Sequence, residues 1–360
     1  MATTLATHVT QQSVKTYIDA QLEHYCQERV NYAATVGVSY ERLWQAISTL
    51  ILAGGKRFRP YMVLATYEAY APTSPLDDIL PAAVAQELLH SAMLIHDDII
   101  DRDVIRYGVK NIAGQYNDTY KPYIADDAER SHMAQSAALL AGDALISDAY
   151  RSLQNTNRPE ELKAKAHTIL ATAVFEVVGG ELLDTEDSFL PAGLIAAEQI
   201  ARYKTASYSF IGPITMGATL ANAPEVEIAR LTTFAEHLGI GYQLRDDLLG
   251  MFGNAQDTGK STTSDMTEGK RTLIIEHFDQ LATDEQKELF AKAYHIATAS
   301  EGAINTAKQQ LVESGAVAAV EAAIVKHHQA AEAIVNELAI SPMSREVFLK
   351  LIHTCLERDM

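Results

Sequence analysis

Residues 91–103 read SAMLIHDDIIDRD, and Asp97, Asp98 and Asp101 interrupt what is otherwise an apolar run. The apolar residues recur at the spacing of an α-helix, so the stretch predicts a helix with one buried face. In that helix Asp97 and Asp101 lie on the same face, one turn apart. Two carboxylates so placed repel each other unless a cation lies between them. The stretch therefore predicts a mostly buried helix that carries a cation site.

The same helical spacing continues along nearly the whole chain. Sustained alternation of period two is absent, and the breaks fall at glycine and proline steps that are too short for an interdomain linker. We therefore predict an all-α, single-domain protein over residues 1–360, with residues 1–12 frayed. The expected helices cover residues 14–36, 40–53, 60–71, 80–106, 129–156, 159–187, 192–222 and 224–252, followed by several more to residue 357.

Composition limits the kinds of partner and compartment. The 360 residues are 48% hydrophobic and carry a net charge of -18, which argues against a surface for nucleic acid or anionic membrane. Cys26 and Cys355 have no spacing typical of a disulfide framework or a zinc site, which favours a reducing cytoplasm. The first residues lack the pattern of an export signal. No apolar run approaches the ~18 residues of a membrane span, so we expect no integral membrane segment.

A second acidic pair strengthens the prediction of a metal site. Residues 240–250 read IGYQLRDDLLG, so Asp246 and Asp247 again follow a long apolar helical run. Carboxylates that point inward from two facing helices are a known way to build a metal site in a helical bundle. Oxygen ligands without His or Cys favour Mg²⁺. A solvated acidic helix end is the alternative for either pair taken alone.

Cations at the start of a helix suit an anionic ligand. Residues 54–60 read GGKRFRP, a turn that presents Lys56, Arg57 and Arg59. Backbone amides together with Lys and Arg there suit a phosphate, although an ordinary solvated loop is the alternative. His90 precedes the first acidic stretch and is either a buried core histidine or a phosphate donor.

Three further lysines stand near small residues: Lys204, Lys260 and Lys270. Each alone is more simply a surface residue. Beside paired aspartates in an acidic protein, they indicate a diphosphate whose charge is shared by Mg²⁺, Lys and Arg. The chain has no Gly-x-Ser-x-Gly, Walker loop or His-Glu-x-x-His motif, so acyl transfer, P-loop hydrolysis and zinc proteolysis have no support.

In their order along residues 53–273, these motifs resemble the trans-type isoprenyl diphosphate synthases, or polyprenyl synthetases. The resemblance includes GGKRFRP, ELLHSAMLIHDDIID, the Gly142-Asp143 step, the KTA of residues 204–206, GYQLRDD and the stretch ending in Lys270. It implies a helical bundle around a deep central cavity, usually in a homodimer. It also implies a Mg²⁺-dependent prenyltransferase that condenses isopentenyl diphosphate with an allylic diphosphate.

The resemblance also implies a role for each candidate residue. The Mg²⁺ ligands would be Asp97, Asp101 and Asp246, with Asp98 and Asp247 assisting. The allylic diphosphate would be held by Arg106, Lys204 and Lys260, and isopentenyl diphosphate by Lys56, Arg59 and His90, with Lys270 a further substrate-binding candidate. The groups near the developing allylic cation would be Thr205, Gln243 and the carbonyl of Lys204.

Three positions depart from the family pattern. Gly250 replaces a third aspartate, Tyr107 replaces the second of two arginines, and Glu181 stands where the family often has Gln. Tyr107 and Gly250 motivate one alternative, a noncatalytic or partner-dependent subunit of a heteromeric synthase. A class I terpene cyclase is a further alternative, against which the GGKRFRP loop and the second aspartate pair both count.

Product length in this family follows cavity depth just before the first aspartate motif. Ala92 and Met93 stand there, one small and one medium-sized, with no aromatic plug. The bulk of Met93 argues against a very deep tunnel. We therefore expect geranylgeranyl diphosphate, about C20, or a slightly longer product, with simple core packing as the alternative role of both residues.

Overall fold

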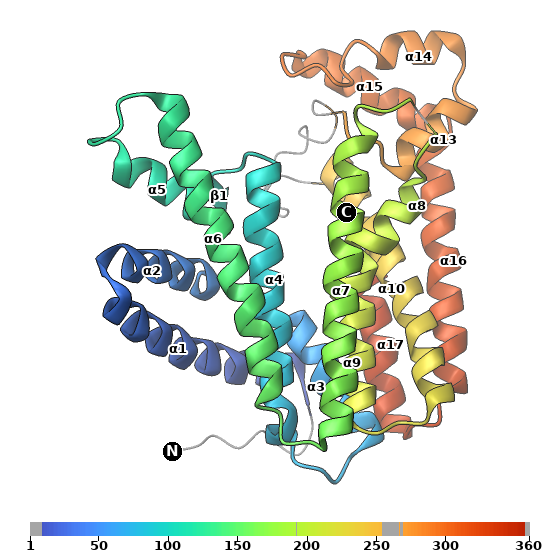
Figure 1. Cartoon of the computed structure of the whole chain (residues 1–360). Coiled ribbons are helices and arrows are strands. Elements are labelled where there is room, and N and C mark those ends of the chain that lie inside the picture. Colours follow the sequence, from blue (N-terminus) through green and yellow to red (C-terminus); the bar gives the residue numbers. More distant parts are fainter. Residues whose placement is uncertain (1–8, 192, 254–265, 267–268, 357–360) are drawn as a thin grey trace. The chain divides into compact units, whose positions relative to one another are not determined.

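The computed structural model describes residues 9–191, 193–253, 266 and 269–356, and this part of the chain is almost entirely helical (Figure 1). The predicted all-α class is confirmed. The described residues form two compact units. Unit 1 falls within residues 1–169 and 216–223, and unit 2 within residues 170–215 and 224–360. A single domain over residues 1–360 stays a prediction.

Unit 1 is built on a long helical pair, α4 and α6, that lies side by side in Figure 1. Thr10 caps the first helix through a reciprocal pair of hydrogen bonds with Ser13. The helix therefore begins inside residues 1–12, which were expected to be frayed. Residues 1–8 lie outside the described part. The elements are α1 (Gln11–Val36), α2 (Val38–Leu52), α3 (Phe58–Tyr70), η1 (Leu76–Ile79), α4 (Leu80–Ile100), α5 (Ile112–Tyr120) and α6 (Asp127–Gln154).

The helix predicted over residues 80–106 ends at Ile100, which corrects that boundary. The chain turns back in a short hairpin of β1 (Ile105–Arg106) and β2 (Val109–Lys110). Its two turn residues, Tyr107 and Gly108, have φ of 54° and 75°, the left-handed conformation that two-residue hairpins need. Helix α5 lies between the helices predicted over residues 80–106 and 129–156, where no helix was expected, and this is a second correction.

Unit 2 surrounds a long helix, α10, which packs against η2, α16 and α17 (Figure 1). The helix predicted over residues 192–222 begins only at Ala197 and contains a π-helical segment, η2. Helices α7 and α9 run across the boundary between the units. The elements are α7 (Glu160–Asp187), α8 (Ala197–Ile200), η2 (Ala201–Ile211), α9 (Gly212–Leu220), α10 (Glu225–Phe252), α13 (Leu273–Leu281), α14 (Asp284–Phe290), α15 (Glu301–Glu313), α16 (Ala316–Glu337) and α17 (Pro342–Leu356).

Two helical stretches, Leu76–Ile100 and Glu160–Asp187, are long and apolar enough to cross a membrane by length and composition alone. This differs from the expectation that no run approaches that length. The first stretch is mostly buried, and a core helix of a soluble protein passes the same test. The second leaves Phe175, Val178 and Leu182 exposed on α7.

Candidate active site

The described residues predicted to form the site fall into two clusters, one in each unit, and the second cluster also includes Glu181 and Asp184, which contact Lys204. The first cluster, in unit 1, consists of Lys56, Arg59, His90, Asp97, Asp98, Asp101 and Arg106. The second cluster, in unit 2, consists of Glu181, Asp184, Lys204, Thr205, Gln243, Asp246 and Asp247. Lys260 lies outside the described residues, and Lys270 belongs to unit 2.

The hairpin after α4 returns Arg106 to the aspartates of the first cluster. Its Nε donates to Asp98 Oδ1 at 2.7 Å, and its NH2 donates to Asp97 Oδ2 at 3.0 Å. Asp98 is buried, and its other oxygen accepts from Asn111 Nδ2 at 2.9 Å. Asp101 is exposed, and its backbone N–H still donates to Asp97 O, so the helical register continues. Both oxygens of Asp98 are therefore engaged within the protein, while Asp97 and Asp101 share the more accessible face.

Burial and charge pairing act in opposite directions on Asp98 and Arg106. Burial raises the pKa of Asp98, although Arg106 and Asn111 act in the opposite direction. Burial also lowers the pKa of Arg106, but the carboxylates of Asp98 and Asp97 outweigh it, so that pKa is raised overall. Asn111 was missed by sequence reasoning. Its only local signal is that it caps α5, where its side chain accepts from the N–H of Gly114 at 2.9 Å.

The first cluster fits a hard divalent cation. Asp97 and Asp101 offer only carboxylate oxygens, which suit Mg²⁺ better than a soft metal. Within the described ranges, no three His, Cys, Asp or Glu side chains form a ready-made metal cage. Mg²⁺ typically binds through one or two carboxylates together with waters and substrate phosphates. The Asp97 and Asp101 carboxylates are therefore as many protein ligands as such a site needs.

Three arginines act on His90 electrostatically. Burial, with the nearby guanidinium groups of Arg59, Arg106 and Arg57, lowers the pKa of His90 well below its usual value. His90 is therefore neutral near pH 7 and offers one ring N–H as a donor. Lys56 is exposed and Arg59 half-buried, as expected for a phosphate-binding loop. Arg57, which the sequence also placed on the outside of that loop, is instead buried, and this is a correction.

The second cluster holds a lysine between two carboxylates. Lys204 Nζ lies 3.1 Å from Glu181 Oε1 and 2.6 Å from Asp184 Oδ2. Glu181, one of the three departures from the family pattern, thus contacts a predicted substrate-binding residue directly. A glutamine there would carry no charge, so Glu181 makes the surroundings of Lys204 more negative and more favourable to a divalent cation.

A hydrogen-bond chain runs from η2 to α10 in the same cluster. Thr205 Oγ1 donates to Gln243 Oε1 at 2.5 Å, and Gln243 Nε2 donates to Asp247 Oδ1 at 2.7 Å. Asp246, next to Asp247, is exposed. The chain leaves Thr205 and Gln243 with fixed orientations, and it gives Asp247 a partner within the protein while its neighbour faces outward.

Two glycines let the elements of the second cluster approach closely. A Cβ on Gly180 of α7 would lie 2.1 Å from the backbone N of Lys204, and a Cβ on Gly239 of α10 would lie 2.5 Å from Cα of Ala206. Any side chain at either position would therefore push η2 away. π-helical segments are rare and occur frequently at functional sites. Sequence reasoning missed both glycines; for Gly180 the available signal was the Gly179-Gly180 pair inside a predicted helix.

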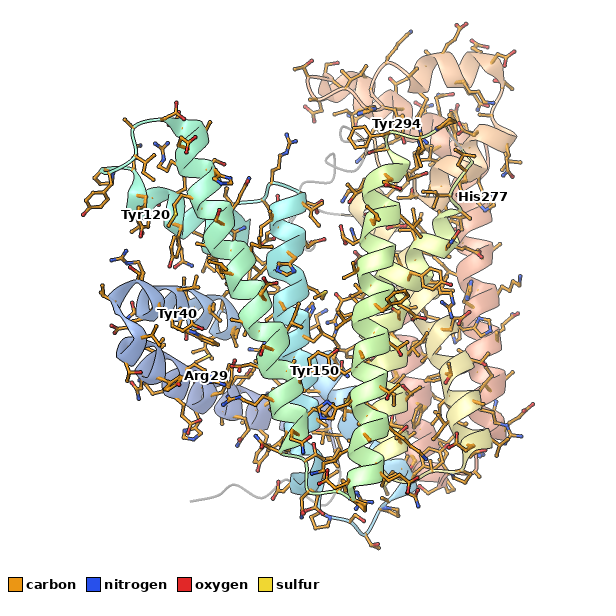
Figure 2. The ribbon with its side chains drawn as sticks, viewed as in Figure 1. Arg29, Tyr40, Tyr120, Tyr150, His277 and Tyr294 are labelled. Carbon is orange, nitrogen blue, oxygen red and sulfur yellow. The ribbon has the colours of Figure 1, made fainter. Side chains whose placement is uncertain are left out.

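Tyr294 fixes the backbone that carries Lys270. Its hydroxyl donates to the carbonyl of Gly269 at 2.8 Å, with the carbonyl of Lys270 at 3.3 Å; Figure 2 labels Tyr294. Gly269 has φ of 77°, and a Cβ there would meet the His295 ring at 2.7 Å. The turn before Lys270 therefore requires glycine.

The two residues predicted to set product length lie on α4, one to two turns before the first aspartates. Ala92 is fully buried, and Met93 is buried as well. Both core packing and a role in the pocket floor are compatible with this burial, so the assignment stays a prediction.

Comparisons with known proteins agree on one family. A family model described as polyprenyl synthetase matches residues 40–311. A short chain isoprenyl diphosphate synthase of Methanocaldococcus jannaschii is 33% identical over 69% of this chain and 70% of its own length. A geranylgeranyl diphosphate synthase of Methanosarcina mazei is 31% identical over 74% and 76% of the two chains. A crystal structure of geranylgeranyl pyrophosphate synthase from Corynebacterium glutamicum, complexed with isoprenyl diphosphate and magnesium, has 27% sequence identity and a TM-score of 0.89, and it covers 97% of this chain and 100% of that chain.

Proposed function

The chain belongs to the polyprenyl synthetase family, and we propose that it condenses isopentenyl diphosphate with an allylic diphosphate to give an all-trans prenyl diphosphate. The observation that carries this proposal is the first cluster, where Arg106 is clamped by Asp97 and Asp98 beside a neutral His90. Carboxylates for a divalent cation thus stand next to cations for a diphosphate. The direct test is the incorporation of labelled isopentenyl diphosphate into a longer prenyl diphosphate.

The cations divide between the two substrates. Arg106 and Lys204, with Lys260, bind the allylic diphosphate. Lys56 and Arg59, with the ring N–H of His90, bind isopentenyl diphosphate. Lys270 is a further substrate-binding cation. Neighbouring carboxylates already pair with Arg106 and Lys204, so both cations are held in place before substrate arrives. This lowers the conformational entropy that the two side chains lose on binding.

The reaction begins when the allylic C–O bond ionises, and its barrier falls as the negative charge on the leaving diphosphate is neutralised. Mg²⁺ would supply most of that neutralisation. Its proposed ligands are Asp97 and Asp101 in the first cluster, with Asp98 assisting, and Asp246 in the second cluster, with Asp247 assisting. The hydroxyl of Thr205, the amide of Gln243 and the carbonyl of Lys204 stabilise the allylic cation by their oriented dipoles. The double bond of isopentenyl diphosphate then forms the new C–C bond, and the departing diphosphate takes the proton. No protein nucleophile is required.

The product is geranylgeranyl diphosphate, about C20, or somewhat longer, because the small Ala92 and the flexible Met93 form the pocket floor. Ala92→Phe is expected to shorten the main product to about C15, since the added ring occupies space that the last isoprene unit needs. Product length is read by mass spectrometry of the prenyl diphosphates.

Val226→Phe is the control for that change, because it adds the same ring on an exposed face of α10 and should leave the product unaltered. If Ala92→Phe makes the same product as the unmodified chain, the pocket floor lies elsewhere and Ala92 is a packing residue only.

The protein acts as a homodimer in the cytoplasm. Phe175 is 82% exposed, and it shares one face of α7 with the exposed Val178 and Leu182, an apolar stripe that a second copy would cover. Burial raises the pKa of the Cys26 thiol to about 11, so it stays an unreactive thiol, as suits a reducing compartment.

Sedimentation equilibrium is expected to give a mass of twice 39.4 kDa for the unmodified chain. Phe175→Glu should shift the protein toward half that mass, because a carboxylate cannot be buried in the apolar stripe without a partner. A monomeric unmodified chain, or binding of the chain to lipid vesicles, would contradict a dimer that covers this stripe.

A further inference from the structure

Arg57 lies in the middle of the GGKRFRP loop, yet it faces the interior of unit 1. Its side chain is only 4% exposed, whereas Lys56 before it is exposed and Arg59 after it is half-buried. Its φ of 49° is in the left-handed region, which non-glycine residues rarely adopt. Such a backbone persists only where the surrounding structure holds it in place.

Three different helices supply the contacts that hold the Arg57 guanidinium. Its Nε donates to Asp19 Oδ1 of α1 at 2.7 Å, and its NH1 donates to Glu87 Oε1 of α4 at 2.6 Å. Its NH2 donates to the carbonyl of Ile51 in α2 at 2.8 Å. The loop also leaves room for it, since a Cβ on Gly55 would lie 3.0 Å from NH1. Each of the three nitrogens of this planar guanidinium therefore donates to a specific acceptor.

These contacts connect the three groups that the proposed function assigns to isopentenyl diphosphate. Lys56 and Arg59 flank Arg57 in the loop, and His90 stands one turn after Glu87 on the same face of α4. Fixing Arg57 between Asp19 and Glu87 therefore fixes the loop cations relative to His90. Its own guanidinium is fully engaged with the protein.

We propose that Arg57 is the positioning residue of the isopentenyl diphosphate site, acting through its contacts with Asp19, Glu87 and Ile51. This inference rests on the proposed function of the first cluster. A change that keeps the positive charge of Arg57 leaves the carboxylates of Asp19 and Glu87 with a counter-ion, but it loses the fixed geometry of the three contacts. Such a change should affect binding of isopentenyl diphosphate more than it affects the fold as a whole.

The test compares steady-state kinetics of Arg57→Lys with those of the unmodified chain. A lysine places one point charge where the guanidinium made three contacts, so the loop of residues 54–60 is held less firmly. Misplacement by ~1 Å can cost about a hundredfold, and we expect KM for isopentenyl diphosphate to rise by about ten- to a hundredfold. KM for the allylic diphosphate and the thermal unfolding midpoint should change little. Glu87→Gln keeps the shape of the side chain but removes one partner of a buried charge, so it should give a smaller rise in KM for isopentenyl diphosphate together with a lower unfolding midpoint.

Lys15→Met is the matched control. Lys15 Nζ binds the same carboxylate, Asp19 Oδ2, at 2.7 Å, so this variant removes the other partner of Asp19 and leaves Arg57 untouched. Its KM values should equal those of the unmodified chain. If Arg57→Lys fails to fold, Asp19→Asn replaces it, because Asp19 is one-third exposed and loses only the contact with Nε. The expected rise in KM for isopentenyl diphosphate is then about threefold or more.

Two outcomes would overturn the inference in an active protein. One is an unchanged KM for isopentenyl diphosphate in the folded Arg57 or Asp19 variants. The other is an equal rise in both KM values with a large fall in the unfolding midpoint, which a purely structural residue would give. An unmodified chain that neither elongates nor binds isopentenyl diphosphate by calorimetry would instead refute the proposed function itself.

Discussion

Asp97→Asn is expected to lower kcat/KM for chain elongation by about a thousandfold, or about 4 kcal/mol of transition-state stabilisation. The change preserves the size of the side chain and removes a charge from the face that Asp97 shares with Asp101. Without this carboxylate Mg²⁺ is held less tightly, so less of the negative charge on the departing diphosphate is neutralised. Asp98 keeps its bond to Arg106, so the hairpin and the fold should survive. Rates are measured with labelled isopentenyl diphosphate at several Mg²⁺ concentrations, and the half-saturating concentration should rise.

Asp118→Asn makes the same charge change in the same unit, in an exposed ion pair with Lys110, and should leave the rate within about twofold. A full rate for Asp97→Asn at limiting Mg²⁺ would show that the first cluster does not bind the metal.

The second large effect is expected at Gly180. In Gly180→Ala the new Cβ meets the backbone of Lys204 at 2.1 Å, and neither backbone can move aside without separating α7 from η2. Overpacking of this kind costs ~1–3 kcal/mol, which should lower the thermal unfolding midpoint. Because the displaced segment carries Lys204 and Thr205, elongation should fall by at least about tenfold, mainly through KM for the allylic diphosphate.

Gly179→Ala is a control one residue away. A Cβ at Gly179 meets nothing within 4 Å, so this variant should gain up to about 1 kcal/mol of stability from the helix preference of alanine and keep its activity. Equal behaviour of the two variants would mean that the contact between α7 and η2 is not tight, and the account of how Lys204 is positioned would fail.

Local patterns predicted much of the fold. The spacing of apolar residues identified most long helices within a few residues of their ends, since that spacing reflects burial of one face. The boundaries failed where the backbone conformation depends on a few residues. The end of α4 is followed by a left-handed φ of 59° at Arg102, and the hairpin depends on left-handed φ at Tyr107 and Gly108; neither an arginine nor a tyrosine signals that conformation in a sequence.

The candidate site also contains residues that the sequence predicted and residues that it could not predict. Asp97, Asp98 and Arg106 were predicted as site residues, and the structure brings them into contact. The burial of Arg57 could not be predicted, because it depends on partners far away in the sequence. The Asp19 carboxylate that pairs with Arg57 comes from 38 residues earlier, and no local pattern encodes that contact.

Some assignments could come only from the family resemblance. Nothing in the spacing of Lys204 or Thr205 separates them from surface residues, and it is their contacts with Asp184 and Gln243 that give them fixed orientations. Asn111 was missed for a similar reason, since its contact with Asp98 requires the hairpin to fold back first.

The central claim is that both clusters serve elongation of an allylic diphosphate. The most direct measurement incubates the purified protein and Mg²⁺ with labelled isopentenyl diphosphate and dimethylallyl, geranyl or farnesyl diphosphate, and sizes the products by mass spectrometry. The account predicts a linear all-trans series that stops near C20 and disappears when Mg²⁺ is chelated. No elongation with any primer, by folded protein that still binds Mg²⁺ and diphosphate, would contradict it and favour a partner-dependent subunit; a cyclic hydrocarbon from one prenyl diphosphate would favour a terpene cyclase.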